Sequence, residues 1–309
     1  MSSAPHGPGK TLPVELFKAA GDAALRVLYR QEFEREKRDF DTSGQGLFCA
    51  ADRSRVIDRL TLTLWDSVLR RNPKTGVTLA AAGGYGRGQL FPCSDVDLLF
   101  LTQEEEARDA IKDQVRSMCQ QMWDAGLRVS PATRTLAECG RFDQDNPEFT
   151  LSLLDCRFLA GDSQLFACLQ SKKLPELIAR ESDSLLQGLA NITSARHQRF
   201  GNTIFHLEPN LKDGPGGLRD CHVSQWLEKI LGADSIKASL GLSAAEDFLS
   251  SARCYLHYTN SRDDNILSWS AQEELAVRGI GTGVGPVSYS GLTLSNTLTV
   301  NFSVHCYLT

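Results

Sequence analysis

The first 70 residues repeat their apolar positions at helical spacing. Residues 12–40 are charged and helix-forming. In residues 50–71 the apolar positions on one helical face are Ile57, Leu60, Leu64 and Val68. Asp52 stands where it would cap the start of this second helix, and Asn72-Pro73 ends it. The pattern therefore predicts two helices ahead of any strand.

Two short, mainly apolar runs follow. Residues 77–82 and 96–101 are bounded by turn residues and predict two buried strands. After them a polar segment that ends near Gly126 predicts an amphipathic helix, with apolar positions at Ile111, Val115, Met118 and Met122. Residues 127–134 predict a third strand. The order of helices, strand, glycine-rich turn, strand, helix and strand predicts a compact α/β unit.

The second half reads as largely helical from residue 138 to residue 278. The expected helices are residues 149–159, 163–169, 174–198, 223–231 and 244–258. A loop dense in Pro and Gly, residues 206–222, interrupts them.

The last 31 residues differ from the rest, because Arg278 is the last Lys, Arg, Asp or Glu of the chain. Residues 292–304 alternate in polarity without charged gatekeepers, which is a hazard for edge pairing. We therefore expect this tail to be an altered terminus or a truncation scar outside the fold.

Composition narrows the possible partners. The chain has 309 residues, of which 41% are hydrophobic and 23% charged, as in ordinary globular proteins. Lys plus Arg (33) fall short of Asp plus Glu (38), which disfavours nucleic acid as a partner. Nine cysteines without a Cys-x-x-Cys pair predict reduced thiols. With no signal peptide and no run of ~18 apolar residues, we expect a cytoplasmic protein without a membrane partner.

The turn between the first two strands is rich in glycine, GGYGRGQLFPCSDVD at residues 83–97. A dinucleotide-binding fingerprint would require a third glycine where Gln89 stands. A Walker-type phosphate loop would require Lys and Ser or Thr where Gln89 and Leu90 stand. Spacing therefore excludes both of these glycine loops.

Two carboxylates follow the glycines at the start of the second strand. Asp95 and Asp97 are two residues apart, so on a strand their side chains share one face. This arrangement suits Mg²⁺ ions that accompany a triphosphate, and the backbone at Gly83 and Gly84 can approach phosphate closely. A solvated start of a strand is the alternative for the acidic pair alone. The combination with the glycine turn favours nucleotide transfer.

Several separated segments resemble one family. Residues 83–101 are similar to the nucleotidyltransferase signature of the DNA polymerase β-like superfamily, in the form typical of PII-protein uridylyltransferase/uridylyl-removing enzymes. EPNLKDGPGGLRD (208–220), LLDCRFLAGD (153–162) and DDNILSWSAQEELA (263–276) also resemble that family. The resemblance covers roughly residues 48–282 and keeps the motifs in order.

The resemblance implies transfer of UMP from UTP to a tyrosine of the PII nitrogen-signalling protein, with Mg²⁺ as cofactor and pyrophosphate as product. It assigns the nucleotide phosphates to Gly83, Gly84, Arg87 and Ser94, and the metal and catalysis to Asp95 and Asp97. For Arg87 an exposed solubilising role is an equal alternative. A third carboxylate is expected on the strand at residues 127–134, which has no acid, so Asp155 and Asp124 are alternatives.

The same resemblance implies the fold, an α/β (α+β) polymerase β-like nucleotidyltransferase domain with a small mixed sheet. We expect an N-terminal helical extension (1–46), the nucleotidyltransferase domain (47–140), a helical domain (141–280) and the atypical tail (281–309). No His-Asp dipeptide occurs, so we expect neither uridylyl-removing activity nor glutamine sensing.

Two other functions remain open. One is a catalytically idle module that binds PII or nucleotide, and the other is an adenylyltransferase acting on glutamine synthetase. In the loop at 206–222, Lys212 and Arg219 contact phosphate or satisfy loop carbonyls, and we favour the structural role. His206 and Glu208 are expected to be a satisfied polar pair rather than a zinc site.

Overall fold

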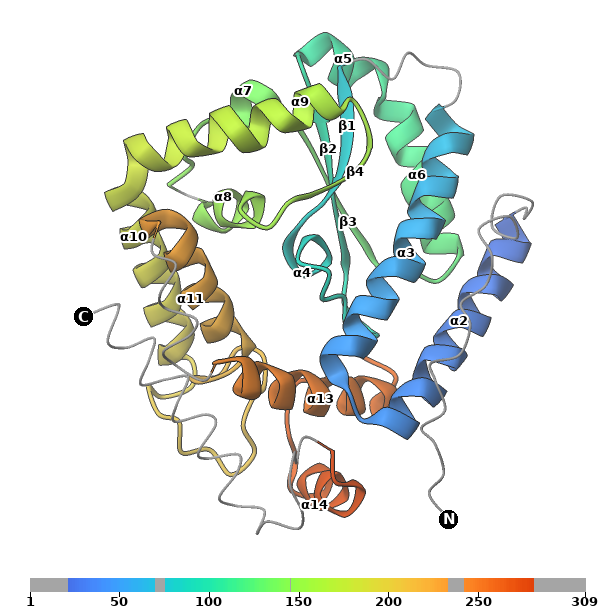
Figure 1. Cartoon of the computed structure of the whole chain (residues 1–309), viewed down its shortest axis with the longest axis vertical. Helices are drawn as coiled ribbons and strands as arrows, with labels where there is room; N and C mark the ends of the chain where they lie inside the picture. Colours follow the sequence, from blue (N-terminus) through green and yellow to red (C-terminus); the bar gives the residue numbers. More distant parts are fainter. Residues whose placement is uncertain (1–21, 70–75, 145, 233–241, 281–309) are drawn as a thin grey trace.

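A four-stranded mixed sheet forms the centre of the molecule (Figure 1). The computed structural model describes residues 22–69, 76–144, 146–232 and 242–280. The strands are β1 (Val77–Ala81), β2 (Val96–Thr102), β3 (Val129–Thr135) and β4 (Arg157–Gly161), in the order β3-β2-β1-β4. β1 is antiparallel to β2 and β4, whereas β2 and β3 are parallel. The predicted small mixed sheet and its three predicted strands are confirmed.

The fourth strand contradicts the helix expected over residues 149–159. Helix α8 (Pro147–Leu153) ends early, and β4 pairs with the free edge of β1. Arg157 donates from Nη1 and Nη2 to Asp58 at 2.9 Å, and a Cβ on Gly161 would lie 2.3 Å from the Val77 oxygen. Pairing with β1 and these contacts override the local helical pattern. β4 of the sheet therefore lies in the segment that was expected to belong to the helical domain. The predicted domain boundaries stay a prediction.

Helices cover both faces of the sheet. On one face, α3 (Gly46–Leu69) and α6 (Lys112–Asp124) pack against Leu98 and Phe100. On the other, α7 (Leu136–Cys139), α9 (Ser163–Cys168) and the π-helix η1 (Leu169–Lys173) pack against Leu99 and Leu101. Because alternate residues of β2 point to opposite buried faces, residues 98–101 of this strand are all apolar. The short α5 (Glu105–Ala110) precedes α6.

A second core lies among the helices beyond the sheet. It joins α10 (Leu174–Gln198), α11 (Leu218–Leu231), α13 (Leu242–Asn260) and α14 (Trp269–Arg278) with the end of α2 (Asp22–Ser43). Figure 1 shows α10 and α11 to one side of the sheet and α13 across the lower end of α3. The helices expected at 163–169, 174–198, 223–231 and 244–258 are confirmed.

Packing rather than capping fixes where α3 begins. The helix starts at Gly46, so Asp52 lies inside it and accepts a hydrogen bond from Arg35 of α2 at 2.6 Å. The prediction that Asp52 caps the helix is therefore wrong. Gly46 lies against α13, where a Cβ would stand 2.2 Å from the Ser251 nitrogen. Only a glycine permits this close approach of two helices.

Some predictions fall on residues that the structure does not describe. These are residues 12–21 of the first expected helix, residues 70–71 of the second with the Asn72-Pro73 pair expected to end it, and the whole tail at 281–309. Within the described ranges, no helix has both the length and the apolar character needed to cross a membrane. The eight cysteines in these ranges are free thiols, as expected.

The glycine turn after β1, which includes α4 (Gly83–Gly86), is packed against β4. A Cβ on Gly86 would lie 2.1 Å from the Asp155 oxygen and 2.9 Å from the Ala81 oxygen, so backbone would have to move. We expect Gly86→Ala to lower the free energy of unfolding by about 2–3 kcal/mol, measured by urea denaturation. Gly88→Ala is the matched control, because Gly88 has a φ of +71° and open space around it. Its cost is about 1 kcal/mol, and equal losses in the two variants would contradict the packing argument.

Candidate functional site

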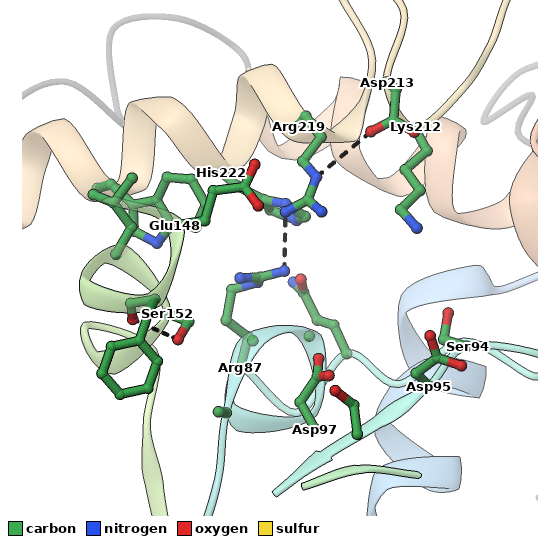
Figure 2. Close-up of a pocket in the computed structure, with 18 of the residues that line it drawn as sticks. Arg87, Ser94, Asp95, Asp97, Glu148, Ser152, Lys212, Asp213, Arg219 and His222 are labelled. Atoms are coloured by element: carbon green, nitrogen blue, oxygen red, sulfur yellow. Dashed lines mark hydrogen bonds and ion pairs between the residues drawn. The ribbon is translucent and has the colours of Figure 1, made fainter. Parts of the chain in front are cut away.

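A pocket of about 590 Å³ lies where β1 runs into α4 and β2 begins. Residues of α4, β2 and β3 form one side, and residues of α8, α10, α11 and the loop before α11 form the other. The six residues predicted to bind nucleotide or metal all line it: Gly83, Gly84, Arg87, Ser94, Asp95 and Asp97. Figure 2 shows Lys212, Arg219 and His222 across the pocket from Asp97. The fold thus brings the predicted residues together, and their roles stay predictions.

Asp97 on β2 is a half-buried carboxylate with a like charge beside it. Burial, and then the charge of Asp95, raise the pKa of Asp97 to about 6. Arg219 and Lys212 oppose this shift, as does a hydrogen bond from Ser130, its partner residue on β3. Because burial and like charge both disfavour its ionised form, Asp97 is a position that a bound cation would stabilise.

Asp95 lies at the more exposed side of the pocket. Arg128 Nε donates to its Oδ1 at 2.7 Å, and both side chains are 55% exposed. An ion pair this exposed contributes at most about 1 kcal/mol, so it competes weakly with a divalent cation. Both carboxylates face the pocket (Figure 2), so the geometry leaves them available to ions.

The turn at Gly83 exists because Asp97 lies against it. Gly83 has a φ of +53°, and a Cβ there would stand 2.8 Å from Asp97 Oδ2. A side chain at this position would displace the carboxylate and strain the backbone. The half-exposed backbone of Gly83 and Gly84 therefore forms the pocket wall beside Asp97.

Arg87 is mostly buried, which rules out the exposed solubilising role. Its Nη1 donates to Asp155, and its Nη2 lies 3.3 Å from His222 Nδ1. Because a guanidinium only donates, His222 Nδ1 accepts, and the imidazole is neutral. Burial, and then the charge of Arg87, hold the pKa of His222 well below its usual value. Arg87 therefore lines the pocket as a cation whose guanidinium is held by the ion pair with Asp155.

Ser94 precedes the acidic pair and lies at the pocket wall. Its Oγ accepts a hydrogen bond from Arg253 Nη2 at 3.2 Å. A hydroxyl that accepts in this way keeps its own hydrogen for another partner, such as a phosphate oxygen.

Lys212, in the loop before α11, and Arg219, in the first turn of α11, face the acidic pair (Figure 2). Lys212 Nζ lies 3.6 Å from Asp263 Oδ2, and Arg219 Nε lies 3.6 Å from Asp213 Oδ1. Ion pairs of this length do not fix the two cations tightly. The sequence favoured a structural role for both, in which they bond to carbonyl oxygens of the loop. Among the described residues, the contacts of these two side chains are with the carboxylates of Asp263 and Asp213 instead. Their shared closeness to the predicted site is a property of the tertiary structure.

Neither of the two alternatives for the expected third carboxylate, Asp155 and Asp124, lines the pocket. Asp155 is fully buried, and its oxygens accept from Arg87, Trp226 and Lys229. Asp124 is exposed at the end of α6 and bonds to Gln120. Within residues 22–69, 76–144, 146–232 and 242–280 there is no cluster of three or more His, Cys, Asp or Glu that could hold a metal.

Two carboxylates still fit Mg²⁺. This ion takes hard oxygen ligands and is commonly held by one or two carboxylates, with substrate phosphates and water completing its shell. Asp95 and Asp97 supply that number of carboxylates. Burial, and then the charge of Asp95, raise the pKa of Asp97, so a bound cation would stabilise its ionised form.

The far end of the pocket is apolar. Its walls include Phe149 of α8, Leu189 and Ile192 of α10 and Trp226 of α11. Thr193 also lines it, and its Oγ1 is buried without a hydrogen-bond partner in the described structure. A flat, weakly polar group such as a nucleobase suits these walls. Sequence reasoning did not find this end, because helical apolar positions are indistinguishable from core residues.

His206 and Glu208 do not bond to each other. His206 Nε2 lies 2.9 Å from the Phe200 oxygen, and Glu208 accepts from the Trp269 nitrogen at 2.9 Å. The expectation of satisfied polar groups holds, but their partners are separate.

Comparison with known proteins supplies the family. A family model described as GlnD PII-uridylyltransferase matches residues 186–284. The bifunctional uridylyltransferase/uridylyl-removing enzyme of Rhodospirillum rubrum is 33% identical over 279 residues, which cover 84% of this chain. The chain spans 29% of the length of that relative. The resemblance predicted from the separated motifs is therefore confirmed, and this chain is a partial relative of the GlnD PII-uridylyltransferase family.

Proposed function

We propose that the pocket binds UTP with Mg²⁺ and that the chain transfers UMP to a tyrosine hydroxyl of the PII protein. The observation that carries this proposal is the half-buried Asp97, which lies against Gly83 and beside Asp95 in a pocket with cations on its far wall. The family relationship supports uridylyl transfer and PII as the acceptor. The pocket supports nucleotide chemistry in general.

The reaction joins the tyrosine oxygen to the α-phosphorus of UTP. The bond from that phosphorus to the β-phosphate oxygen breaks, so pyrophosphate leaves, and the tyrosine proton goes to solvent. Asp95 and Asp97 would hold Mg²⁺, which supplies charge stabilisation for the attacking and leaving oxygens. Arg87, on the same side as the acidic pair, and Lys212 and Arg219, on the opposite side, offer positive charge to the triphosphate.

The apolar end of the pocket would receive the nucleoside. Phe149 and Trp226 offer apolar surface to the base, and Thr193 offers a hydroxyl without a partner. The preference for uracil over adenine rests on the family relationship rather than on these contacts.

The first test replaces the acidic pair. With UTP, Mg²⁺ and PII, we expect Asp97→Asn and Asp95→Asn each to lower pyrophosphate release at least about 100-fold, because either loss removes a charged metal ligand. The melting temperature of Asp97→Asn should not fall, since its charge is disfavoured by burial and by Asp95. Release is followed by a coupled phosphate assay.

Asp124→Asn is the matched control, because this exposed carboxylate lies outside the pocket and should leave the rate unchanged. A wild-type chain that is stabilised by UTP against heating, but releases no pyrophosphate, would indicate the idle binding module. Faster release with ATP, in the presence of glutamine synthetase, would indicate the adenylyltransferase. Either result would contradict the proposed function.

The second test concerns the far wall. Arg219→Ala should raise the KM for UTP about tenfold, because it removes one charged contact to phosphate. The kcat should change less. Arg116→Ala is the matched control, because Arg116 is an exposed arginine on α6 that pairs only with Asp113 among the described ion pairs. An unchanged KM in Arg219→Ala would return Arg219 to the structural role.

A further inference from the structure

Asp263 lies between α13 and α14, far along the chain from the acidic pair, and gathers side chains from three segments. Its carboxylate is 2.9 Å from Arg253 Nη2 and 3.0 Å from His257 Nε2, both on α13. It is also 3.9 Å from Arg128 Nη2, before β3, and 3.6 Å from Lys212 Nζ. One carboxylate thus serves four basic side chains at the edge of the pocket.

Three of these basic side chains each hold one of three consecutive motif residues. His257 Nδ1 accepts from the Cys93 nitrogen at 3.1 Å. Arg253 Nη2 donates to Ser94 Oγ at 3.2 Å, and Arg128 Nε donates to Asp95 Oδ1 at 2.7 Å. The contacts of Cys93, Ser94 and Asp95 therefore converge on Asp263 through one side chain each.

The tautomer of His257 fits this arrangement. A backbone N–H can only donate, so Nδ1 of His257 accepts and the ring proton is on Nε2, facing Asp263. Asp263 Oδ1, 3.0 Å from Nε2, is the negative charge nearest to this proton and therefore favours this tautomer.

The charge of Asp263 also restrains the cations around it. Burial opposes ionisation of Asp263, but His257, Arg253 and Lys212 outweigh it and hold its pKa well below the usual value. Without this carboxylate, Arg253 and Lys212 would be left as unpaired cations beside Asp95 and Asp97. They would then be free to pair with the two acids and to compete with Mg²⁺.

We propose that Asp263 is a positioning residue for the acidic pair. Through His257 and Arg253 it fixes Cys93 and Ser94, the two residues directly before Asp95, so that Asp95 faces the pocket beside Asp97. This inference rests on the proposed function for its effect on catalysis, whereas its effect on the segment 93–95 is independent of any activity.

The test compares Asp263→Asn with Asp264→Asn. Asp264 is the neighbouring carboxylate, and it bonds to Asn260, Arg262 and the Ile266 nitrogen, none of which contacts the motif. The rate of alkylation by iodoacetamide is measured at Cys93 and at Cys254 by peptide mass spectrometry over a range of pH and compared per thiolate, because burial and, after it, the charge of Asp263 itself raise the pKa of Cys93. Cys93 is half-buried and reports the motif, whereas Cys254 is fully buried and reports global unfolding.

We expect Asp263→Asn to speed alkylation of Cys93 at least about tenfold. Without the ion pairs of Asp263, Arg253 and His257 hold residues 93–95 less firmly, so this segment opens locally more often. Cys254 should react as slowly as in the wild type, and Asp264→Asn should leave both rates unchanged. An unchanged rate at Cys93 would overturn the proposal. Equal acceleration at Cys93 and Cys254, including a variant that fails to fold, would also overturn it, because Asp263 would then be a residue of global stability.

Turnover provides the second measurement. In the UTP assay Asp263→Asn should lower kcat about 10- to 100-fold, as loss of a partner behind a metal ligand does, while the KM for UTP does not rise. An unchanged kcat would overturn the positioning role. A wild-type chain without turnover would contradict the proposed function alone, because the alkylation comparison needs no turnover.

Discussion

The fully buried carboxylate of Asp155 ties the glycine turn to the helical part of the molecule. It accepts from Arg87 beside that turn, from Trp226 Nε1 at 2.9 Å and from Lys229 Nζ at 2.7 Å, the last two on α11. A buried carboxylate needs such partners, since its charge would otherwise be too costly to keep out of water. Because its partners come from both sides of the pocket, the position of the pocket walls depends on this one group. The backbone oxygen of Asp155 also lies so close to Gly86 that no side chain fits there.

Two acids face two cations across the pocket. Asp95 and Asp97 lie on the sheet side, and Lys212, in the loop before α11, and Arg219, in the first turn of α11, lie opposite them. This arrangement suits a ligand that carries both metal ions and phosphates, because the metal ions would face the two acids and the phosphates would face the two cations. Phe149 and Trp226, at the apolar end, would then contact the uncharged base of that ligand. The proposed nucleotide chemistry follows from the whole cavity more than from any single motif.

Asp263 illustrates how a helical segment supports a motif on the sheet. Cys93, Ser94 and Asp95 lie in a short irregular stretch before β2, where no ladder of backbone hydrogen bonds fixes them. Side chains of α13 and the residue before β3 hold them instead. A site built in this way depends on the helical part for its geometry even though its acids belong to the sheet.

The sequence alone determined the elements whose signals are local. The apolar run of β2, the periodicity of α6 and the spacing from Gly84 to Asp97 all depend on residues close together in the chain, so pattern and motif predicted the small mixed sheet and its acidic pair. Tertiary structure alone decided β4, because the run from Arg157 to Gly161 becomes a strand only by pairing with β1. It also decided that Asp155 bonds to Arg87, Trp226 and Lys229, and that Asp263 lies beside the side chains that contact Cys93 and Ser94. These roles depend on burial and on contacts between residues far apart in the sequence, and the spacing of residues along the chain predicts neither.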